Sequence, residues 1–408
     1  MLRSILLIFS LVSVANAQTP YRVVMPREDG VPIVYNMTVS AEKNKPVWVI
    51  RNASEKLRVD SIRKTGDSLY VDMPFFDSRI AMSVSNDRSM RGYWYKGTTT
   101  ADLVMPVEAT PGISWRFQPI KGDAGADISG RYAVIFTKAD GTQRRSVAEF
   151  KQVKNKLTGT FLNPSGDYRF LEGIVTGDSL MLSCFDGSHA YYFGAKIKTD
   201  GSIEKGIYCS GPKYKESWTA VKDPNAQVES SGAMMYLKEG EERLNFRFPD
   251  LDSNMVSISD DRYRNKVVVI QIMGSWCPNC MDETAFLSEY YKKNRQRGVE
   301  VIGLAYEYTS DFRKAEKTLR KFQQRHKVDY PFLNTGVITS DTLRTEKTLP
   351  QMTAIKAFPT TIFVGRDGKV KKVHPGFAGP GTGEHHEQFR KEFEATVEEL
   401  LKQVADSR

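Results

Sequence analysis

Two cysteines with two residues between them are the part of this sequence best suited to chemistry. Cys277 and Cys280 lie in the run Trp276-Cys277-Pro278-Asn279-Cys280. Cysteines at this spacing can form a small disulfide ring, and such a ring opens and closes by thiol–disulfide exchange through a mixed disulfide with a second molecule. The residue types and their spacing therefore predict redox chemistry at Cys277 and Cys280.

The local structure expected around the pair predicts different roles for the two cysteines. A buried strand is expected directly before Cys277 and a helix directly after it. Unpaired backbone N–H groups and the helix dipole stabilise a thiolate at the start of a helix. We therefore expect Cys277 to be the exposed nucleophile, and Cys280, one turn inside the helix, to resolve the mixed disulfide.

A cysteine pair of this spacing also occurs as a purely structural disulfide or as half of a zinc site. A zinc site needs two further Cys or His ligands at suitable spacing. The chain has four cysteines, and the other two, Cys184 and Cys209, lie in the other half of the sequence. Those two could form a structural disulfide of their own in an oxidising compartment. His385-His386-Glu387 has no ligand pattern and is interpreted as the start of the last helix, so we expect no metal and no cofactor.

Apolar runs and amphipathic stretches predict the elements that position the pair. Val267–Met273 is continuously apolar, which is typical of a strand that is buried on both faces. Strands and helices alternate from there to the C-terminus, and this alternation indicates an α/β sheet with crossover connections. The expected order is the strand Val267–Met273, a helix from the cysteines to about Gln296, the strand Val299–Ala305, the helix Asp311–His326, the strands Thr360–Val364 and Val370–His374, and the helix Glu387–Ala405.

This part of the chain resembles the TlpA/ResA-like branch of exported thioredoxin-fold proteins. The resemblance is carried by Val267–Met273, by Trp276-Cys277-Pro278-Asn279-Cys280, and by Phe358-Pro359-Thr360-Thr361, and it covers about Phe246 to Leu401. It implies a thioredoxin-like domain at about residues 243–408 with protein-disulfide oxidoreductase activity. The partners implied are thiol or disulfide protein substrates and an upstream redox donor or acceptor.

The resemblance also implies roles for residues that would contact the substrate. Pro359 would be a cis proline beside the cysteine pair, a type of peptide bond that is uncommon in folded proteins; otherwise it is an ordinary trans proline at the start of a strand. The backbone of Phe358 would then be free to pair with a substrate strand. Trp276 would cover one side of the disulfide.

Glu283 is the residue that the resemblance implies for proton transfer. It lies three residues after Cys280, and therefore on the same helix face one turn further on. The resolving cysteine must lose its proton as it attacks, and Gln271, which stands where thioredoxin has a buried aspartate, cannot accept one. Glu283 is thus the proton acceptor in reach; the alternative is a solvent-facing carboxylate in the first helical turn, where acidic residues are favoured.

The N-terminal half has the pattern of an all-β domain, residues 18–225. Short alternating runs such as Ile33–Val39 and Tyr191–Ile197 are separated by turn sequences. Thr65-Gly66-Asp67-Ser68-Leu69 recurs 111 residues later as Thr176-Gly177-Asp178-Ser179-Leu180. We predict a duplicated β-meander or barrel-like domain, with repeats at about 18–125 and 126–222, and a polar linker at 226–242.

The first 17 residues are predicted to be a signal peptide. Arg3 supplies the positive charge, Ile5–Val14 the apolar stretch and Ala15-Asn16-Ala17 the cleavage pattern. No later apolar run approaches the roughly 20 residues that cross a bilayer. The net charge of +9 is spread along the chain, without the basic patch or motif of a nucleic-acid-binding protein. We expect an exported protein, in a bacterial periplasm by the resemblance, with no membrane span and no nucleic-acid partner.

Two other functions are consistent with parts of the sequence. The first is a thiol peroxidase of the thioredoxin superfamily, although the stretch Ile270–Cys277 has no proline and no threonine at the positions that a peroxidatic cysteine requires. The second is a periplasmic binding module in which the β domain captures a partner and the redox motif is secondary. Aromatic residues on the β strands favour a packed core, and we expect this half to do no chemistry.

Overall fold

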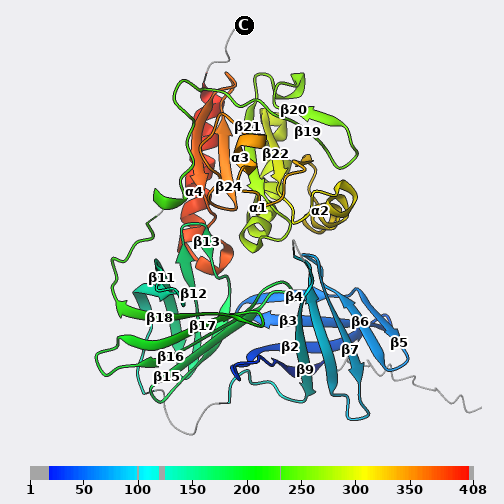
Figure 1. Cartoon of the computed structure of the whole chain (residues 1–408), viewed down its shortest axis with the longest axis vertical. Helices are drawn as coiled ribbons and strands as arrows, with labels where there is room; N and C mark the ends of the chain where they lie inside the picture. Colours follow the sequence, from blue (N-terminus) through cyan, green and yellow to red (C-terminus); the bar gives the residue numbers. More distant parts are fainter. Residues whose placement is uncertain (1–17, 99–100, 119–124, 230, 404–408) are drawn as a thin grey trace, which may run out of the picture.

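The computed structural model describes residues 18–98, 101–118, 125–229 and 231–403. The predicted signal peptide lies outside the described residues. Figure 1 shows two β units side by side, with an α/β domain above them that is coloured from green through yellow to red. The predicted fold class is confirmed: an all-β N-terminal region precedes a thioredoxin-like α/β domain.

The first β unit is a nine-stranded antiparallel sheet in the order β4-β3-β2-β1-β9-β8-β7-β6-β5. Buried and exposed residues alternate along its strands, because successive side chains of a strand point to opposite faces. The strands are β1 Thr19–Met25, β2 Ile33–Glu42, β3 Lys45–Asn52, β4 Glu55–Val59, β5 Ile62–Thr65, β6 Ser68–Asp72, β7 Ser78–Val84, β8 Met90–Lys96 and β9 Leu103–Pro111.

The second β unit also has nine strands, in the order β11-β10-β18-β17-β16-β15-β14-β12-β13. An additional pairing joins β11, the first strand of this order, with β12, the next to last, so the sheet closes on itself like a barrel. The strands are β10 Gly130–Thr137, β11 Gln143–Val153, β12 Lys156–Asn163, β13 Gly166–Asp167, β14 Leu171–Thr176, β15 Ser179–Phe185, β16 Ala190–Ile197, β17 Ile203–Ser210 and β18 Tyr214–Lys222.

The repeated sequences occupy equivalent places in the two β units. Thr65–Leu69 forms the turn from β5 to β6, and Thr176–Leu180 forms the turn from β14 to β15. Gly66 and Gly177 have φ angles of +58° and +56°, in the left-handed region that favours glycine. Glycine therefore suits the same position in both turns.

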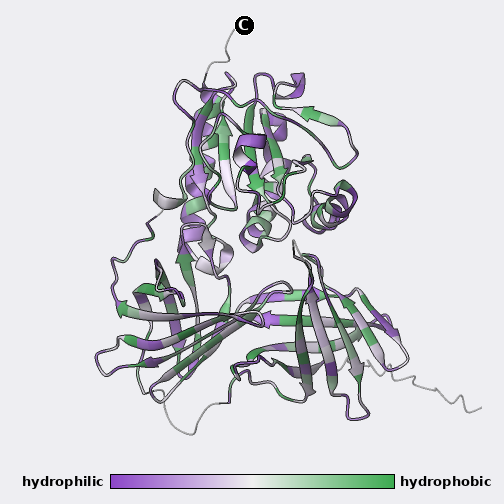
Figure 2. Ribbon diagram, viewed as in Figure 1, coloured by the Kyte–Doolittle hydropathy of each residue, from purple (hydrophilic) through white to green (hydrophobic). Residues whose placement is uncertain are grey.

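The α/β domain is built on a five-stranded sheet in the order β23-β22-β21-β24-β25. Every residue of β21 is buried, as its continuous apolar sequence predicted, and Figure 2 shows the central strands of this sheet in green. The elements are η1 Ser231–Ala233, β19 Arg247–Pro249, β20 Met255–Ser257, η2 Asp261–Tyr263, β21 Val267–Met273, α1 Pro278–Asn294, η3 Arg295–Arg297, β22 Val299–Ala305, α2 Phe312–His326, β23 Phe332–Asn334, α3 Arg344–Thr348, β24 Thr360–Val364, β25 Val370–Pro375, η4 Pro380–Thr382 and α4 Glu384–Lys402.

Alternate residues of β21 face two different cores. Val267 and Val269 pack in one core with side chains of α1, α2 and α4. Val268 and Ile270 pack in the other with Met235 and residues that precede the sheet. Since Met235 is fully buried and Leu237 pairs with Met352, part of the segment predicted as a linker packs on the α/β domain.

Candidate active site

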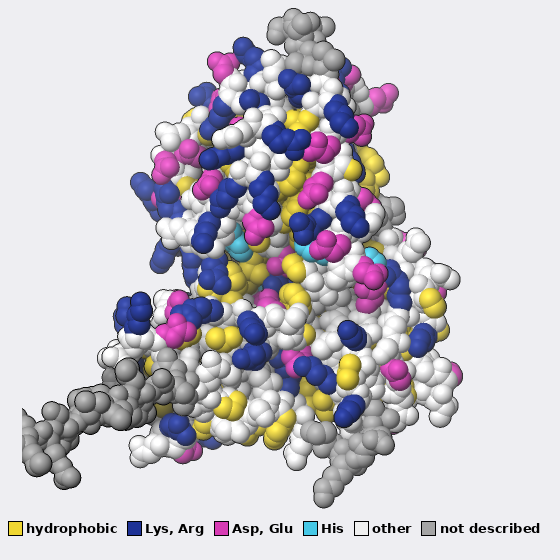
Figure 3. Space-filling model, turned by 180° about the vertical axis from the view of Figure 1, so that it is seen from behind, with side chains coloured by type: hydrophobic (Ala, Val, Ile, Leu, Met, Phe, Trp, Pro, Cys, Tyr) yellow, Lys and Arg dark blue, Asp and Glu magenta, His cyan; other side chains and the backbone are white. Residues whose placement is uncertain are grey.

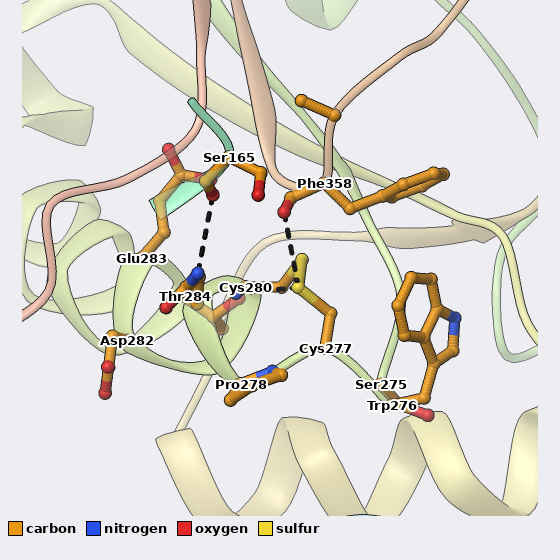
Figure 4. The surroundings of a disulfide bond; sticks show 12 residues. Ser165, Ser275, Trp276, Cys277, Pro278, Cys280, Asp282, Glu283, Thr284 and Phe358 are labelled. Carbon is orange, nitrogen blue, oxygen red and sulfur yellow. Dashed lines mark hydrogen bonds between the residues drawn. A yellow bond between two sulfur atoms is a disulfide. The ribbon is translucent and has the colours of Figure 1, made fainter. Parts of the chain in front are cut away.

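The cysteine pair lies where β21 is followed by α1, as the sequence predicted. Cys277 is the N-cap of α1 and Pro278 is its first residue, a position that suits proline because the N–H it lacks would be unpaired there. Cys277 and Cys280 form a disulfide with their Cα atoms 5.2 Å apart (Figure 4). The backbone N–H of Cys280 points at Cys277 Sγ, 3.2 Å away. Reduction would therefore release a Cys277 thiolate against the N–H groups of the helix.

Trp276, Phe358 and Pro359 lie together beside this disulfide. The ring centres of Trp276 and Phe358 are 5.3 Å apart, and Cys277 Sγ is 3.6 Å from the carbonyl oxygen of Phe358. The peptide bond between Phe358 and Pro359 is cis, as the resemblance implied. The indole N–H of Trp276 donates to the carbonyl of Tyr306 at 2.8 Å, which holds the ring in place.

The cysteine pair is enclosed. Cys277 is 3% exposed and Cys280 is 0% exposed. The expectation that Cys277 is exposed is therefore wrong for this state of the chain. The sequence pattern describes the α/β domain alone, whereas residues of the second β unit lie against Asn279 in the folded chain.

Glu283 lies inside the α/β domain and not in solvent. It is fully buried, and its carboxylate accepts hydrogen bonds from the side chains of Thr361 and of Gln271, the latter at 2.8 Å. Burial raises the pKa of Glu283 to about 7, although both hydrogen bonds act in the opposite direction. A carboxyl group with this pKa can both take up and release a proton near neutral pH.

Gln271 connects Glu283 with the cysteine motif. Its side-chain amide donates to the carboxylate of Glu283 and lies 3.3 Å from the carbonyl oxygen of Cys280. Its amide oxygen accepts from the hydroxyl of Thr284 at 3.0 Å. Gln271 is fully buried on β21, so the strand fixes the carboxylate of Glu283 relative to the first turn of α1.

Glu307 is a second buried carboxylate at the site, and sequence reasoning missed it. It accepts hydrogen bonds from the backbone N–H and the hydroxyl of Ser275, at 2.8 and 2.6 Å. Burial is the largest influence on Glu307 and raises its pKa. Because Ser275 directly precedes Trp276, this carboxylate positions the loop that leads into the cysteine motif. A single acidic residue after a strand is no recognisable signal, so nothing in the sequence pointed to it.

A cavity of about 800 Å³ lies beside Trp276, between the first β unit and α2. Charged residues of both signs line it, and Glu307 lies at its wall. Burial lowers the pKa of Lys96 there to about 8. The lining includes Asp72, Asp77, Arg79, Lys96, Asp102, Lys314, Lys317 and Lys321. Figure 3 shows that Lys and Arg are also spread over the α/β domain on the far side, interleaved with Asp and Glu.

Arg169 joins both β units to the active-site helix. Its guanidinium donates to the carboxylates of Asp282 on α1 and Glu55 in the first β unit, and to the carbonyl of Pro278 at 3.3 Å. Arg169 is 3% exposed, and the acidic partners raise its pKa against the opposing effect of burial. Burial raises the pKa of Asp282 to about 6. Removing one member of such a buried ion pair is destabilising, because it leaves the other charge buried and unpaired.

Cys184 and Cys209 do not form the disulfide that their number allowed. Both are free and buried. Cys184 on β15 pairs with Tyr191 of β16, and Cys209 on β17 pairs with the next residue, Tyr192. Since neighbouring residues of a strand point to opposite faces, the two thiols lie on opposite faces of the sheet. Counting cysteines could not reveal this register.

Two general properties of the described residues bear on the site. No group of three or more His, Cys, Asp or Glu side chains within them is arranged to hold a metal ion. None of the helices in this part of the chain is both long enough and apolar enough to cross a membrane. His385 and His386 lie in the first turn of α4, as predicted.

Comparison with known proteins agrees with this geometry. Residues 238–387 match the protein family described as Redoxin. The thiol-disulfide oxidoreductase ResA of Halalkalibacterium halodurans is 26% identical over 140 residues, which cover 34% of this chain and 69% of that protein. The protein of the same name from Bacillus thuringiensis subsp. konkukian is 26% identical over 153 residues, covering 37% of this chain and 76% of its own length.

Solved structures similar to this chain include a DsbF homologue from Corynebacterium diphtheriae. The two are 21% identical, with a TM-score of 0.30, and the match covers 42% of this chain and 98% of that one. The sequence relatives and the family match both fall on the C-terminal part of the chain. That part is a redoxin domain with a thioredoxin-like fold and a cysteine pair of a thiol-disulfide oxidoreductase.

Proposed function

We propose that this chain, with a redoxin domain similar to ResA oxidoreductases as its C-terminal part, is an exported enzyme that exchanges the Cys277–Cys280 disulfide with partner proteins. The observation that carries the proposal is the disulfide at the N-terminus of α1, one turn before a buried carboxyl group whose pKa is about 7. A purely structural disulfide has no use for a proton acceptor beside it.

The reduced enzyme would transfer two electrons to a disulfide substrate in two steps. The Cys277 thiolate attacks one sulfur of the substrate, the substrate disulfide breaks, and the second substrate sulfur leaves as a thiolate. Cys280 then gives its proton to the carboxylate of Glu283, and its thiolate attacks Cys277 Sγ. The enzyme disulfide forms, the mixed disulfide breaks, and the first substrate sulfur leaves as a thiolate that takes up a proton.

The other parts of the site have supporting roles in this proposal. Trp276 covers one side of the disulfide, and Phe358 offers its backbone beside Pro359 to an extended substrate segment. An upstream redox protein returns the enzyme to its starting state, and the relative potentials of the partners decide whether the enzyme acts as a reductase or an oxidase. The predicted signal peptide supports export to a periplasm, where disulfides form and persist.

A turnover assay distinguishes this function from the thiol peroxidase and from a binding module. With dithiothreitol as the electron donor, the full-length chain is expected to accelerate the reduction of insulin disulfides, and the Cys277→Ser variant is not. Hydroperoxide consumption at the same enzyme concentration is expected to stay at the rate of dithiothreitol alone. Hydroperoxide turnover without insulin reduction would assign the chain to the peroxidases instead.

A further inference from the structure

A hairpin of the second β unit lies on the first turn of the active-site helix. Its residues, 163–167, form the end of β12, a two-residue turn and β13, and are called the β12–β13 hairpin below. The amide nitrogen of Asn279, which stands between the two cysteines, lies 3.4 Å from the carbonyl of Ser165. In the opposite orientation of this amide, Asn279 instead donates to the carbonyl of Asp167 at 3.3 Å and accepts from the N–H of Asp167 at 3.2 Å.

The same hairpin also contacts the loop that follows β25. The carboxylate of Asp167 accepts a hydrogen bond from the backbone N–H of Gly379 at 2.9 Å. At Gly376 a Cβ atom would lie 2.6 Å from the carbonyl of Pro164, so the two backbones are in direct contact there. The hairpin is therefore held between the start of α1 and the loop after β25, on the face of the redoxin domain where the disulfide lies.

The fit of the hairpin depends on a glycine. A Cβ atom on Gly166 would lie 2.1 Å from the side-chain nitrogen of Asn279 and 2.9 Å from the carbonyl of Phe377. Both distances are too short for any larger residue, and the φ of +137° at Gly166 also disfavours one. Arg169, two residues beyond the hairpin, adds its ion pair with Asp282 of α1.

These contacts place the hairpin beside the enclosed cysteines, against Asn279 between them. A substrate disulfide must reach Cys277 Sγ, yet Cys277 is 3% exposed while the hairpin is in place. Only the molecules in which the hairpin is displaced could then react. The observed rate would be the rate of these open molecules multiplied by the fraction of the population that they make up. A bulky substrate needs a larger displacement than a small one.

Resting on the function proposed above, we propose that the β12–β13 hairpin is a specificity-determining segment of this enzyme. It occupies the substrate surface of the redoxin domain and excludes protein disulfides that cannot displace it. Small disulfides pass it more easily. The second β unit is thus part of the active site's selectivity, although it supplies no reacting group.

The test compares two glycine substitutions in the same β unit of the full-length chain. Gly166→Ala forces the hairpin away from Asn279 and Phe377. Gly141→Ala is the matched control, because Gly141 also has a positive φ, +83°, in a hairpin turn but has nothing within 4 Å of its Cβ position. Insulin reduction and exchange with 5,5′-dithiobis(2-nitrobenzoate) are measured for each variant.

Gly166→Ala is expected to raise the rate with insulin about tenfold, as expected when a minor open state becomes the main one, and to change the rate with the small disulfide less. Gly141→Ala is expected to change neither rate. Equal rates for the wild type and a folded Gly166→Ala variant would overturn the proposal, as would the same gain in Gly141→Ala.

A labelling experiment separates this proposal from the proposed function and does not depend on one variant. In the reduced wild type, N-ethylmaleimide should label Cys277 much faster than a maleimide that carries a polyethylene glycol chain, and Asp167→Ala should narrow that difference. Peptide mapping identifies the labelled cysteine. If no variant reduces insulin while the labelling difference narrows as expected, the exchange function fails and the role of the hairpin stands. If the two maleimides label Cys277 of Asp167→Ala at rates that differ as much as in the wild type, the proposed role of the hairpin is contradicted.

Discussion

Replacement of Cys280 by serine is expected to accumulate mixed disulfides between Cys277 and substrate proteins. The Cys277 thiolate can still form the first covalent bond, but the sulfur that would resolve it is absent. Cys277→Ser should trap little protein and should lose exchange activity by a factor on the order of 10³ or more, as when a nucleophile is removed. The difference follows from geometry, because Cys277 caps α1 and Cys280 lies fully buried within it.

Non-reducing gels and mass spectrometry of the trapped species measure this effect. Cys184→Ser and Cys209→Ser are the controls, because both residues are free, buried and in the second β unit. Neither control is expected to trap substrate. Equal trapping by Cys277→Ser and Cys280→Ser would overturn the assignment of nucleophile and resolving cysteine.

Glu283→Gln is expected to slow the resolving step by about a hundredfold near pH 7 and to remove the levelling-off of the rate above that pH, because general acid–base catalysis contributes at least about that factor. The buried carboxyl of Glu283 has a pKa raised to about 7. Below that pH it is protonated and cannot accept the proton of Cys280, so the wild-type rate should rise with pH through about 7 and then level off. Glutamine at this position cannot accept a proton at any pH.

Rapid mixing of the mixed disulfide at a series of pH values measures the resolving rate. Glu289→Gln is the matched control, because Glu289 is exposed on the same helix. Its profile should overlay that of the wild type. If the profile of Glu283→Gln overlays it as well, Glu283 does not transfer the proton.

The free energy of unfolding of the oxidised chain also depends on the carboxyl group of Glu283. Because the pKa of Glu283 is higher in the folded chain than the ordinary value of 4.5, the folded chain binds this proton more tightly than the unfolded chain. The free energy of unfolding should therefore fall as the pH rises from 4.5 to 7, by about 3 kcal/mol from this group alone. Glu283→Gln should show a fall smaller by that amount.

The sequence predicted those parts of the site that depend on local pattern. Three elements lie at the residues that the sequence predicted: the buried strand Val267–Met273, the helix after the cysteines and the strand Thr360–Val364. Each needs only its own residues and the period of its side chains. The last helix begins at Glu384, three residues before the predicted start, because it follows directly on the turn of η4.

The features that sequence reasoning missed depend on contacts between distant segments. Arg169 and Asp282 are 113 residues apart, and Ser165 and Asn279 are 114 residues apart. None of these residues belongs to a motif, and no periodicity of the β strands indicates that a hairpin will lie on another domain. Cys277 is 3% exposed and its Sγ lies 3.6 Å from the carbonyl oxygen of Phe358, and the sequence pattern around the cysteines gives no sign of this burial.

The central claim is that the Cys277–Cys280 disulfide is redox-active, and its redox equilibrium in the folded chain tests this directly. The full-length protein is equilibrated in dithiothreitol or glutathione buffers of graded potential, alkylated, and analysed by mass spectrometry. We predict that the two cysteines change together as one two-electron couple, with a tenfold change in the ratio of oxidised to reduced chain for about every 30 mV, while the fold is retained. A disulfide that stays oxidised until the chain unfolds would contradict the claim and would make the pair a structural one.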